Sequence, residues 1–222
     1  MPGGMTSTAK SAPTSWRTAV VTACVFFVVA AATRLVVDRE LFAQLHRAAL
    51  SPHRVTSLEH QRHLLVVALW AGRVAIGVTL VCWLIPARRI VQGYDCGMFR
   101  IEPDTVISGF LLSPINVLAP YFHVADVWMA GDPSRPPDAI IDRMRVPLRI
   151  KAWWWVFVVS VVVALLGFLF QERYSRGWSA AGLRMEEIVV GGQAVSAALL
   201  VWIVVDATRF IAWRASPTGL ET

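Results

Sequence analysis

Charged residues are scarce in this chain: Asp, Glu, Lys and Arg make up 16% of its 222 residues, whereas a soluble domain carries about a quarter. Lysine is nearly absent, with only Lys10 and Lys151 among 21 basic residues. There are three cysteines and no C-x-x-C pair, so the pattern supports neither a disulfide framework nor a cysteine metal site. These shortages argue against a soluble catalytic module.

Recognisable catalytic motifs are lacking as well. The chain contains no HExxH, GxSxG, P-loop or GxGxxG motif, and no pair of carboxylates within one apolar stretch. We therefore predict a non-enzymatic protein with no cofactor, no metal and no catalytic residue. The net charge of +6 does not indicate nucleic-acid binding, because the basic excess lies in loops beside apolar stretches. Arginine in such loops sets topology and contacts anionic lipid.

What the chain has in abundance is long apolar runs. A helix needs roughly 20 apolar residues to cross a bilayer, and in lipid only a helix satisfies its own backbone within such a run. Four stretches qualify: Trp16–Val37, Leu64–Ile85, Lys151–Phe170 and Ile188–Trp213. The sequence predicts an all-α integral membrane protein, a bundle of four transmembrane helices. We place the spans at about 16–37, 57–85, 150–171 and 188–213, between a disordered tail 1–15 and a tail 215–222.

Two signals lie between the first and second spans. Asp38–Leu50 is amphipathic and predicts a short helix in the membrane plane, ended by Ser51-Pro52. Thr56-Ser57-Leu58-Glu59 resembles a capping box and predicts that the second helix begins before its apolar core. A cleaved secretory signal is the alternative for the first span, because Ala30-Ala31-Ala32 could form its cleavage site. Arg34 and the amphipathic segment that follow favour a retained span.

The segment Ile107–Ala130 is almost long and apolar enough to span. Pro114 and Pro120 break regular helix twice, and Asn116, His123 and Asp126 are polar. Broken helix at membrane depth is tolerated where protein or water covers the freed backbone groups. We therefore predict a re-entrant or interfacial half-helix over 107–130. The alternative, a fifth span, would move the C-terminus to the outer side.

Orientation follows from the basic residues near the spans. With the N-terminus inside, twelve Lys and Arg lie inside and eight outside, so both termini are predicted to be cytoplasmic. The inside residues are Lys10, Arg17, Arg88, Arg89, Arg100, Arg135, Arg143, Arg145, Arg149, Lys151, Arg209 and Arg214. The outside residues are Arg34, Arg39, Arg47, Arg54, Arg62, Arg173, Arg176 and Arg184. Trp153-Trp154-Trp155 would then anchor the third span at the inner boundary.

Several short motifs in one order resemble a family of bacterial membrane proteins called domain of unknown function 4328. The matching residues are Asn116, Pro120-Tyr121, Trp128, Asp132-Pro133 and Trp153-Trp154, with Trp83-Leu84 and Ala87-Arg88-Arg89 upstream. The resemblance implies a four-span fold in a bacterial cytoplasmic membrane, and it carries no activity. Three features depart from the family pattern. Pro114 lies one position nearer Asn116, Ala125-Asp126 replaces a basic–acidic pair, and Met129 replaces an arginine.

Arg73 lies near the middle of the second span, where a charge costs about 2.5–3.5 kcal/mol even on the lenient insertion scale. It must face the bundle interior, water or a partner. In a structural role it would bond helix-end carbonyls, Gln193 or Ser196. In a functional role it would join a polar ligand site with Asn116, His123 and Asp126. Asp206, deeper in the fourth span, is expected to pair with Arg209 instead.

Histidines and small residues give weaker signals. His60 and His63 lie three residues apart on one helix, a spacing that suits a metal or haem edge but also a solvated helix start, which we favour. Gly192–Ser196, Ala68–Gly72 and Ala71–Ala75 have small-xxx-small spacing. We interpret these spacings as packing within the bundle, with dimerisation as the alternative.

The leading functional prediction is a partner-binding, accessory or regulatory membrane subunit. Its partners would be the lipid bilayer and a membrane protein or a second copy, with no nucleic acid. The alternative is a small-solute or ion transporter or channel-like unit with a polar site around Arg73 and the broken helix. A haem- or metal-binding subunit is a third class.

Overall fold

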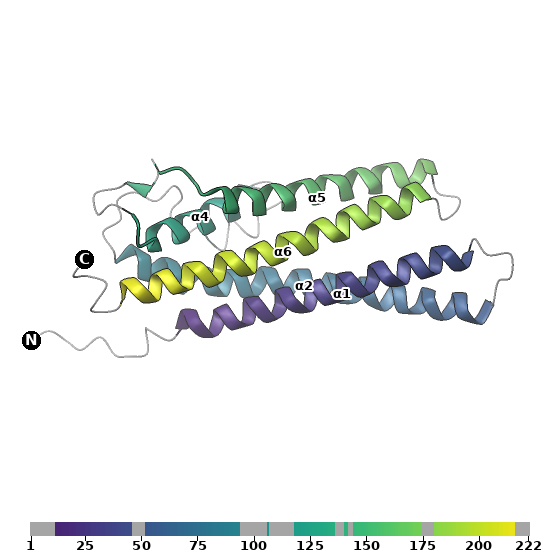
Figure 1. The fold of residues 1–222 in the computed structure, drawn as a ribbon, viewed down its shortest axis with the longest axis horizontal. Helices are drawn as coiled ribbons and strands as arrows, with labels where there is room; N and C mark the ends of the chain where they lie inside the picture. The colour runs from purple at the N-terminus through teal and green to yellow at the C-terminus, as the bar shows by residue number, and fades with distance from the viewer. Residues whose placement is uncertain are drawn as a thin grey trace, which may run out of the picture. The chain divides into compact units, whose positions relative to one another are not determined.

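The computed structural model describes residues 12–45, 52–93, 106, 118–135, 140–141, 144–174 and 180–215. Every regular element among them is a helix (Figure 1). The long helices are α1 (Ala12–Leu45), α2 (Pro52–Gln92), α5 (Leu148–Tyr174) and α6 (Ala180–Arg214), and α4 (Ala119–Gly131) is short. The four long helices are long and apolar enough to cross a membrane. The prediction of an all-α, four-span, multi-pass membrane protein is confirmed.

The chain divides into two compact units, and each long helix contributes residues to both. Unit 1 consists of Met1–Ala23, Ala75–Lys151 and Leu200–Thr222, and it includes α4. Unit 2 consists of Cys24–Val74 and Ala152–Leu199. The N-terminal end of α1, residues 12–23, and the C-terminal end of α6, residues 200–214, belong to unit 1.

The first helix corrects two predictions. It begins at Ala12, inside the predicted disordered tail, and it continues to Leu45, so residues 38–45 form no separate in-plane helix. No proline or glycine interrupts this stretch, and Arg34 holds Asp38 one turn further on through a 3.1 Å ion pair. Buried charge pairing therefore keeps the amphipathic segment in line with the apolar span. Residues 46–50 lie outside the described part of the chain.

The second helix is 41 residues long and extends beyond the predicted span at both ends. It begins at Pro52 and not at a Thr56 cap, because proline fits the first turn of a helix, where its missing N–H costs no hydrogen bond. It also continues through Pro86 to Gln92, as transmembrane helices can when neighbouring groups satisfy the freed carbonyl. The predicted start at a Thr56 cap was therefore wrong, whereas the prediction that the helix begins before its apolar core is confirmed.

The short helix α4 is the C-terminal half of the predicted broken segment. Pro120 lies in its first turn, and Gly131, Asp132 and Pro133 follow its last apolar residues, a typical helix end. Its 13 residues reach about 20 Å, less than the roughly 30 Å hydrocarbon core, so α4 alone does not form a fifth span. Nearly all of its side chains are buried. Residues 107–117, including Pro114 and Asn116, lie outside the described residues.

Each unit has its own apolar interior. In unit 1, Trp83, Leu84, Met129, Ile150 and Ile203 are among the largest fully buried side chains. In unit 2 the helices approach closely at glycines. A Cβ on Gly72 of α2 would lie 3.1 Å from the Phe27 ring of α1, and a Cβ on Gly192 of α6 would meet Ser160 of α5. Small residues thus allow close packing within unit 2.

Candidate functional site

The interior of unit 1 contains a buried cluster of three ionisable side chains from α2 and α4. Arg88 Nη1 lies 2.6 Å from Nδ1 of His123 and 3.7 Å from a carboxylate oxygen of Asp126. All three side chains are buried. His123 and Asp126 are three residues apart on α4, so both face α2. Because arginine only donates, Nδ1 must accept, and the imidazole is neutral with its proton on Nε2.

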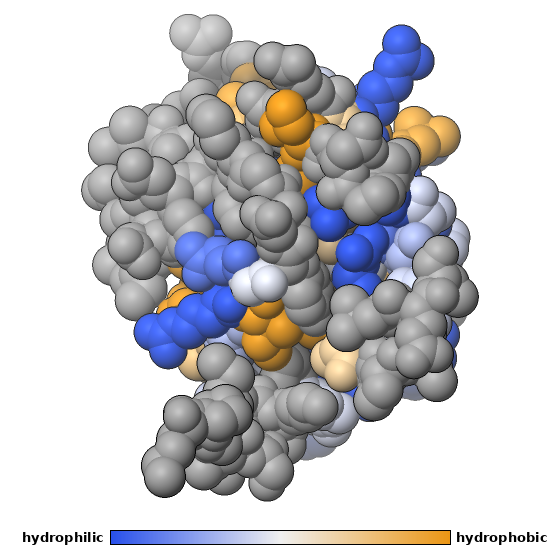
Figure 2. Space-filling view, turned by 90° about the vertical axis from the view of Figure 1, so that its left-hand side faces the viewer, coloured by the Kyte–Doolittle hydropathy of each residue, from blue (hydrophilic) through white to orange (hydrophobic). Residues whose placement is uncertain are grey.

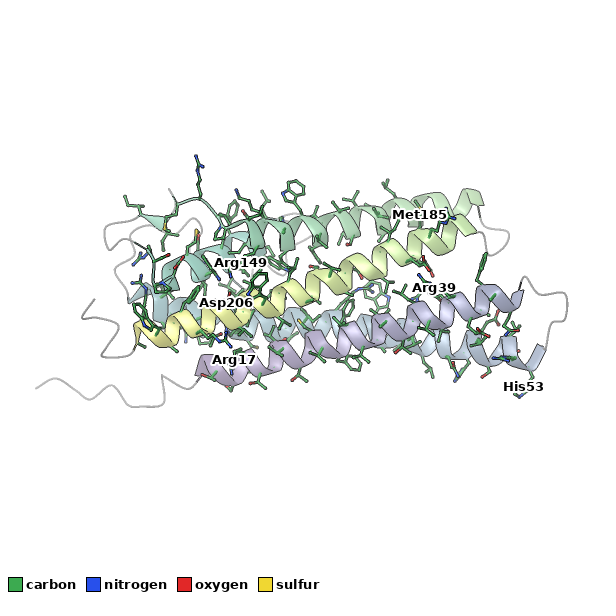
Figure 3. The ribbon with its side chains drawn as sticks, in the orientation of Figure 1. Arg17, Arg39, His53, Arg149, Met185 and Asp206 are labelled. Atoms are coloured by element: carbon green, nitrogen blue, oxygen red, sulfur yellow. The ribbon has the colours of Figure 1, made fainter. Side chains whose placement is uncertain are left out.

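A second cluster in unit 1 lies along one ridge of α6. Arg149 Nη1 of α5 donates to Asp206 at 2.5 Å, and its guanidinium lies 5.0 Å from the centre of the Trp202 ring. Figure 3 labels Arg149 of α5 and, close by, Asp206 of α6. The expected Asp206–Arg209 pair was wrong, because Arg149 reaches Asp206 from another helix while Arg209 is exposed. The ridge has four-residue spacing and consists of Trp202, Asp206, Phe210 and Arg214.

The same ridge holds the C-terminal end of α4. The Trp128 ring packs edge-on against Phe210, with ring centres 5.2 Å apart. Arg214 donates from Nε to the carbonyl of Gly131 at 3.2 Å and from Nη2 to that of Asp132 at 2.7 Å. A cation that binds the last carbonyls of a helix satisfies orphan acceptors and complements the helix dipole. A Cβ on Gly131 would lie 3.2 Å from Phe210 Cβ, so a small residue is needed here.

Unit 2 contains a network of charges that joins α1, α2 and α6. The carboxylate of Asp38 is buried and accepts from Arg34 at 3.1 Å and Arg62 at 3.0 Å. Glu186 of α6 binds the same two arginines, at 3.1 Å and 2.9 Å. Two arginines and two carboxylates therefore alternate around one closed arrangement. Arg39 and Glu187 add a more exposed pair between α1 and α6 at 2.6 Å.

Arg73 is held within unit 2 by an amide and two rings. Its Nε and Nη2 both donate to Oε1 of Gln193, at 3.2 and 2.6 Å. Its guanidinium carbon lies 4.8 Å from the centre of the Trp70 ring and 5.8 Å from that of Phe27. Of the partners considered from the sequence, Gln193 is the one that the structure places there. The chemistry is that of a neutral acceptor with cation–π contacts.

The other residues singled out in the sequence are placed as follows. His123 and Asp126 meet at Arg88, whereas Arg73 belongs to unit 2 and Asn116 lies outside the described residues. A single site of Arg73, Asn116, His123 and Asp126 stays a prediction. The family-motif residues Pro120, Trp128, Trp153 and Trp154 are buried, and the Tyr121 ring lies tilted by 60° against that of Phe122 with ring centres 5.1 Å apart. Of the three consecutive tryptophans, only Trp155 faces outward.

The histidines and the small residues singled out in the sequence lie in different surroundings. His53, His60 and His63 are all exposed on the first turns of α2. Gly192 and Ser196 pack against α5: Gly192 contacts Ser160, and Ser196 Oγ lies 3.5 Å from the carbonyl of Trp153. The spacing at Gly192 therefore serves packing within unit 2.

Sequence reasoning missed the arginines that complete these clusters. None of them, Arg34, Arg62, Arg88 or Arg149, was predicted to pair with a carboxylate or a histidine. One signal was available for Arg34, because Asp38 follows it by one helical turn. The residue before Asp126 is Ala125, and the cation beside Asp126 is Arg88 of α2.

The comparisons with known proteins give one match. The family model described as "Domain of unknown function (DUF4328)" matches residues 47–211, which include α2, α4, α5 and most of α6. No curated protein and no solved structure matches the chain.

Proposed function

The chain belongs to the DUF4328 family, whose description assigns no activity, and we propose that it is a non-enzymatic accessory or regulatory subunit. It would lie in the bacterial cytoplasmic membrane and bind another membrane protein through its exposed helix faces. The proposal concerns three features: the partners of Arg73 within the fold, the exposed face of α2 and the orientation of the chain in the membrane.

The observation that carries the proposal is that Arg73 has its partners within the fold. An intramembrane arginine that binds a substrate needs donors directed at that substrate. Here two of its nitrogens donate to Gln193, and Trp70 and Phe27 lie close to the guanidinium. The Asp38–Glu186 network likewise uses its charges within the fold. These pairings support a scaffold that presents a surface, because polar groups are used to fix helix positions.

The exposed face of α2 supports partner binding. Trp70 is 62% exposed, although it lies inside the apolar stretch Leu64–Ile85 and not at a membrane boundary, where tryptophan is usually enriched. Val67 and Val74 are exposed on the same face, and Ala71 lies between them. A large ring beside a small residue suits helix–helix packing, since tryptophan is also enriched at protein interfaces. We define Val67, Trp70, Ala71 and Val74 as the α2 face.

Site-specific photo-crosslinking in native membranes tests partner binding. A photoreactive residue at Ala71 should give an adduct of one defined mass, and Trp70→Leu should reduce its yield. A photoreactive residue at Leu165, an exposed position of α5, is the matched control. An adduct of twice the chain mass would identify a second copy as the partner. Identical adduct patterns from Ala71 and Leu165 would contradict a specific α2 face.

Orientation completes the proposal. The basic count of twelve against eight supports cytoplasmic termini, and four crossings return the chain to the side on which it began. In a background without the native cysteines, Met5→Cys and Thr218→Cys should react from the cytoplasmic side and Ser179→Cys from the outside. Reaction of the two terminal cysteines on opposite sides would overturn this topology.

A small-solute or ion transporter is the second candidate, favoured by one observation. Arg88, His123 and Asp126 are ionisable side chains buried together on a half-helix and its neighbour, and such groups mark ion pathways in many transporters. Flux of protons or small ions into vesicles containing the purified protein, lost in Asp126→Asn, would favour this candidate. Leakage equal to that of protein-free vesicles would count against it.

A further inference from the structure

Arg135 has a buried guanidinium, two nitrogens of which have no hydrogen-bond partner among the described residues. It lies in the turn that follows α4, and only 6% of its surface is exposed. Its Nε and Nη1 are buried and have no hydrogen-bond partner among the described residues. Burying a guanidinium without an acceptor is unfavourable, so the position requires a negatively charged or strongly accepting group.

A second arginine adds positive charge close to Arg135. Its backbone N–H donates to the carbonyl of Asp132 at 3.2 Å, and the same oxygen accepts from Arg214 Nη2 at 2.7 Å. The guanidinium of Arg214 therefore lies next to the turn that bears Arg135. Seven residues before Arg135, on α4, the indole N–H of Trp128 is also buried and has no partner among the described residues. The nearby carboxylate of Asp132 accepts from Ser134 N and Oγ, at 2.9 and 2.7 Å.

We propose that Arg135, with Arg214 beside it, forms a binding site for a phosphate-class anion at the C-terminal end of α4. The two unmatched nitrogens of Arg135 are donors, and what they lack is an acceptor. The planar fork of arginine fits the oxygens of phosphate in a bidentate manner.

The position also indicates where the anion comes from. Arg214 ends the apolar stretch Ile188–Trp213 of α6, so the site lies at a membrane boundary, the depth of lipid headgroups. Figure 2 faces the side of the molecule where α6 ends and shows hydrophilic residues beside hydrophobic ones. The phosphate of an anionic phospholipid and a soluble phosphate share this chemistry. The experiment below distinguishes them.

The test uses the full chain, purified in a zwitterionic detergent without lipid. Thermal unfolding is followed while phosphatidylglycerol, phosphatidylcholine, inorganic phosphate or an equal ionic strength of chloride is added. A rise in melting temperature with phosphatidylglycerol alone identifies the headgroup as the ligand, and a rise with inorganic phosphate identifies a soluble anion. No rise with either overturns the proposal.

Variants assign the effect to Arg135. Arg135→Met removes the unmatched donors, so it should fold at least as stably as the wild type without anion and should lose the anion-dependent rise. Arg209→Met removes an exposed arginine from the same end of α6 and should keep the rise. Arg135→Lys keeps the charge without the fork and should bind about tenfold more weakly, the loss expected for one charge-assisted hydrogen bond. An anion response of Arg135→Lys equal to that of the wild type would refute the site.

Discussion

Arg73→Met separates the two leading functional classes. The substitution removes the hydrogen bonds of 3.2 and 2.6 Å to Gln193 and the contacts with the rings of Trp70 and Phe27. Methionine fills a similar volume, so packing loss is small. A structural arginine should therefore affect folding stability, whereas a ligand-binding arginine should affect only binding or flux.

The magnitude follows from the contacts. Polar contacts between membrane helices contribute about 0.6 kcal/mol on average and up to about 1.7 kcal/mol. A partly desolvated cation–π contact adds about 0.5–2 kcal/mol. We expect Arg73→Met to lower the free energy of unfolding by about 2 kcal/mol. A second contribution has the same sign. In the separated state α2 would expose Arg73 to lipid, which raises the free energy of that state, and methionine removes this cost. The substitution therefore stabilises the separated state and lowers the free energy of unfolding further.

The assay is reversible unfolding in mixed micelles, followed by circular dichroism. Arg89→Met, which removes an exposed arginine of the same helix, is the control. Gln193→Leu should cost a similar amount to Arg73→Met, and the double variant should cost little more than either. The resulting coupling would be nearly as large as the cost of one single variant, about 2 kcal/mol. If Arg73→Met unfolds like the wild type, the structural role is refuted and a polar ligand site becomes the better explanation.

Three further substitutions test the packing of each unit by the same unfolding measurement. Gly192→Ala should destabilise by about 1–3 kcal/mol because its Cβ meets the hydroxyl of Ser160, whereas Gly191→Ala, with nothing within 4 Å, should be neutral or stabilising. Adding Ser160→Ala should rescue Gly192→Ala, and failure to rescue would contradict the steric explanation. Asp38→Asn should cost about 3 kcal/mol, since two arginines lose a buried carboxylate; an unchanged stability would mean that Glu186 alone suffices. Trp83→Phe should cost about 1–2 kcal/mol, because the indole N–H donates at 3.1 Å to a threonine of α6, and no loss would show that this bond is dispensable.

The four helices could be predicted from the sequence because each apolar run is longer than a soluble helix needs. Their ends could not. The prediction ended the first span at Val37 and began a separate helix at Asp38, where polarity rises. The structure continues α1 through this point, because the polar side chains find partners on α2 and α6. The rise in polarity at Asp38 therefore marks the point where side chains of α1 begin to pair with charges on other helices. It does not mark the end of the helix.

The sites were predicted in part for a related reason. Gln193 was a predictable partner of Arg73, because few other polar residues lie at similar depth. Asp206 was assigned to Arg209 because a local spacing of three is visible in one sequence. Its actual partner, Arg149, comes from a different helix, and that contact depends on how α5 and α6 are rotated about their axes. A single sequence does not fix that rotation.

The polar contacts also explain how the helices choose their rotation. Lipid tails are as apolar as leucine, so apolar packing alone favours one helix face only weakly over another. A polar side chain that turned toward lipid would lose its partner. The rotation of α6 that brings Asp206 to Arg149 also places Phe210 and Arg214 against the C-terminal end of α4. In unit 2, Asp38 and Glu186 fix α1, α2 and α6 in the same manner. Arg135 breaks this rule, since its donors are buried without an acceptor among the described residues. Arg34 and Arg88, the other buried arginines among the described residues, each form an ion pair with a carboxylate, and this contrast is the reason to seek the acceptor of Arg135 outside the chain.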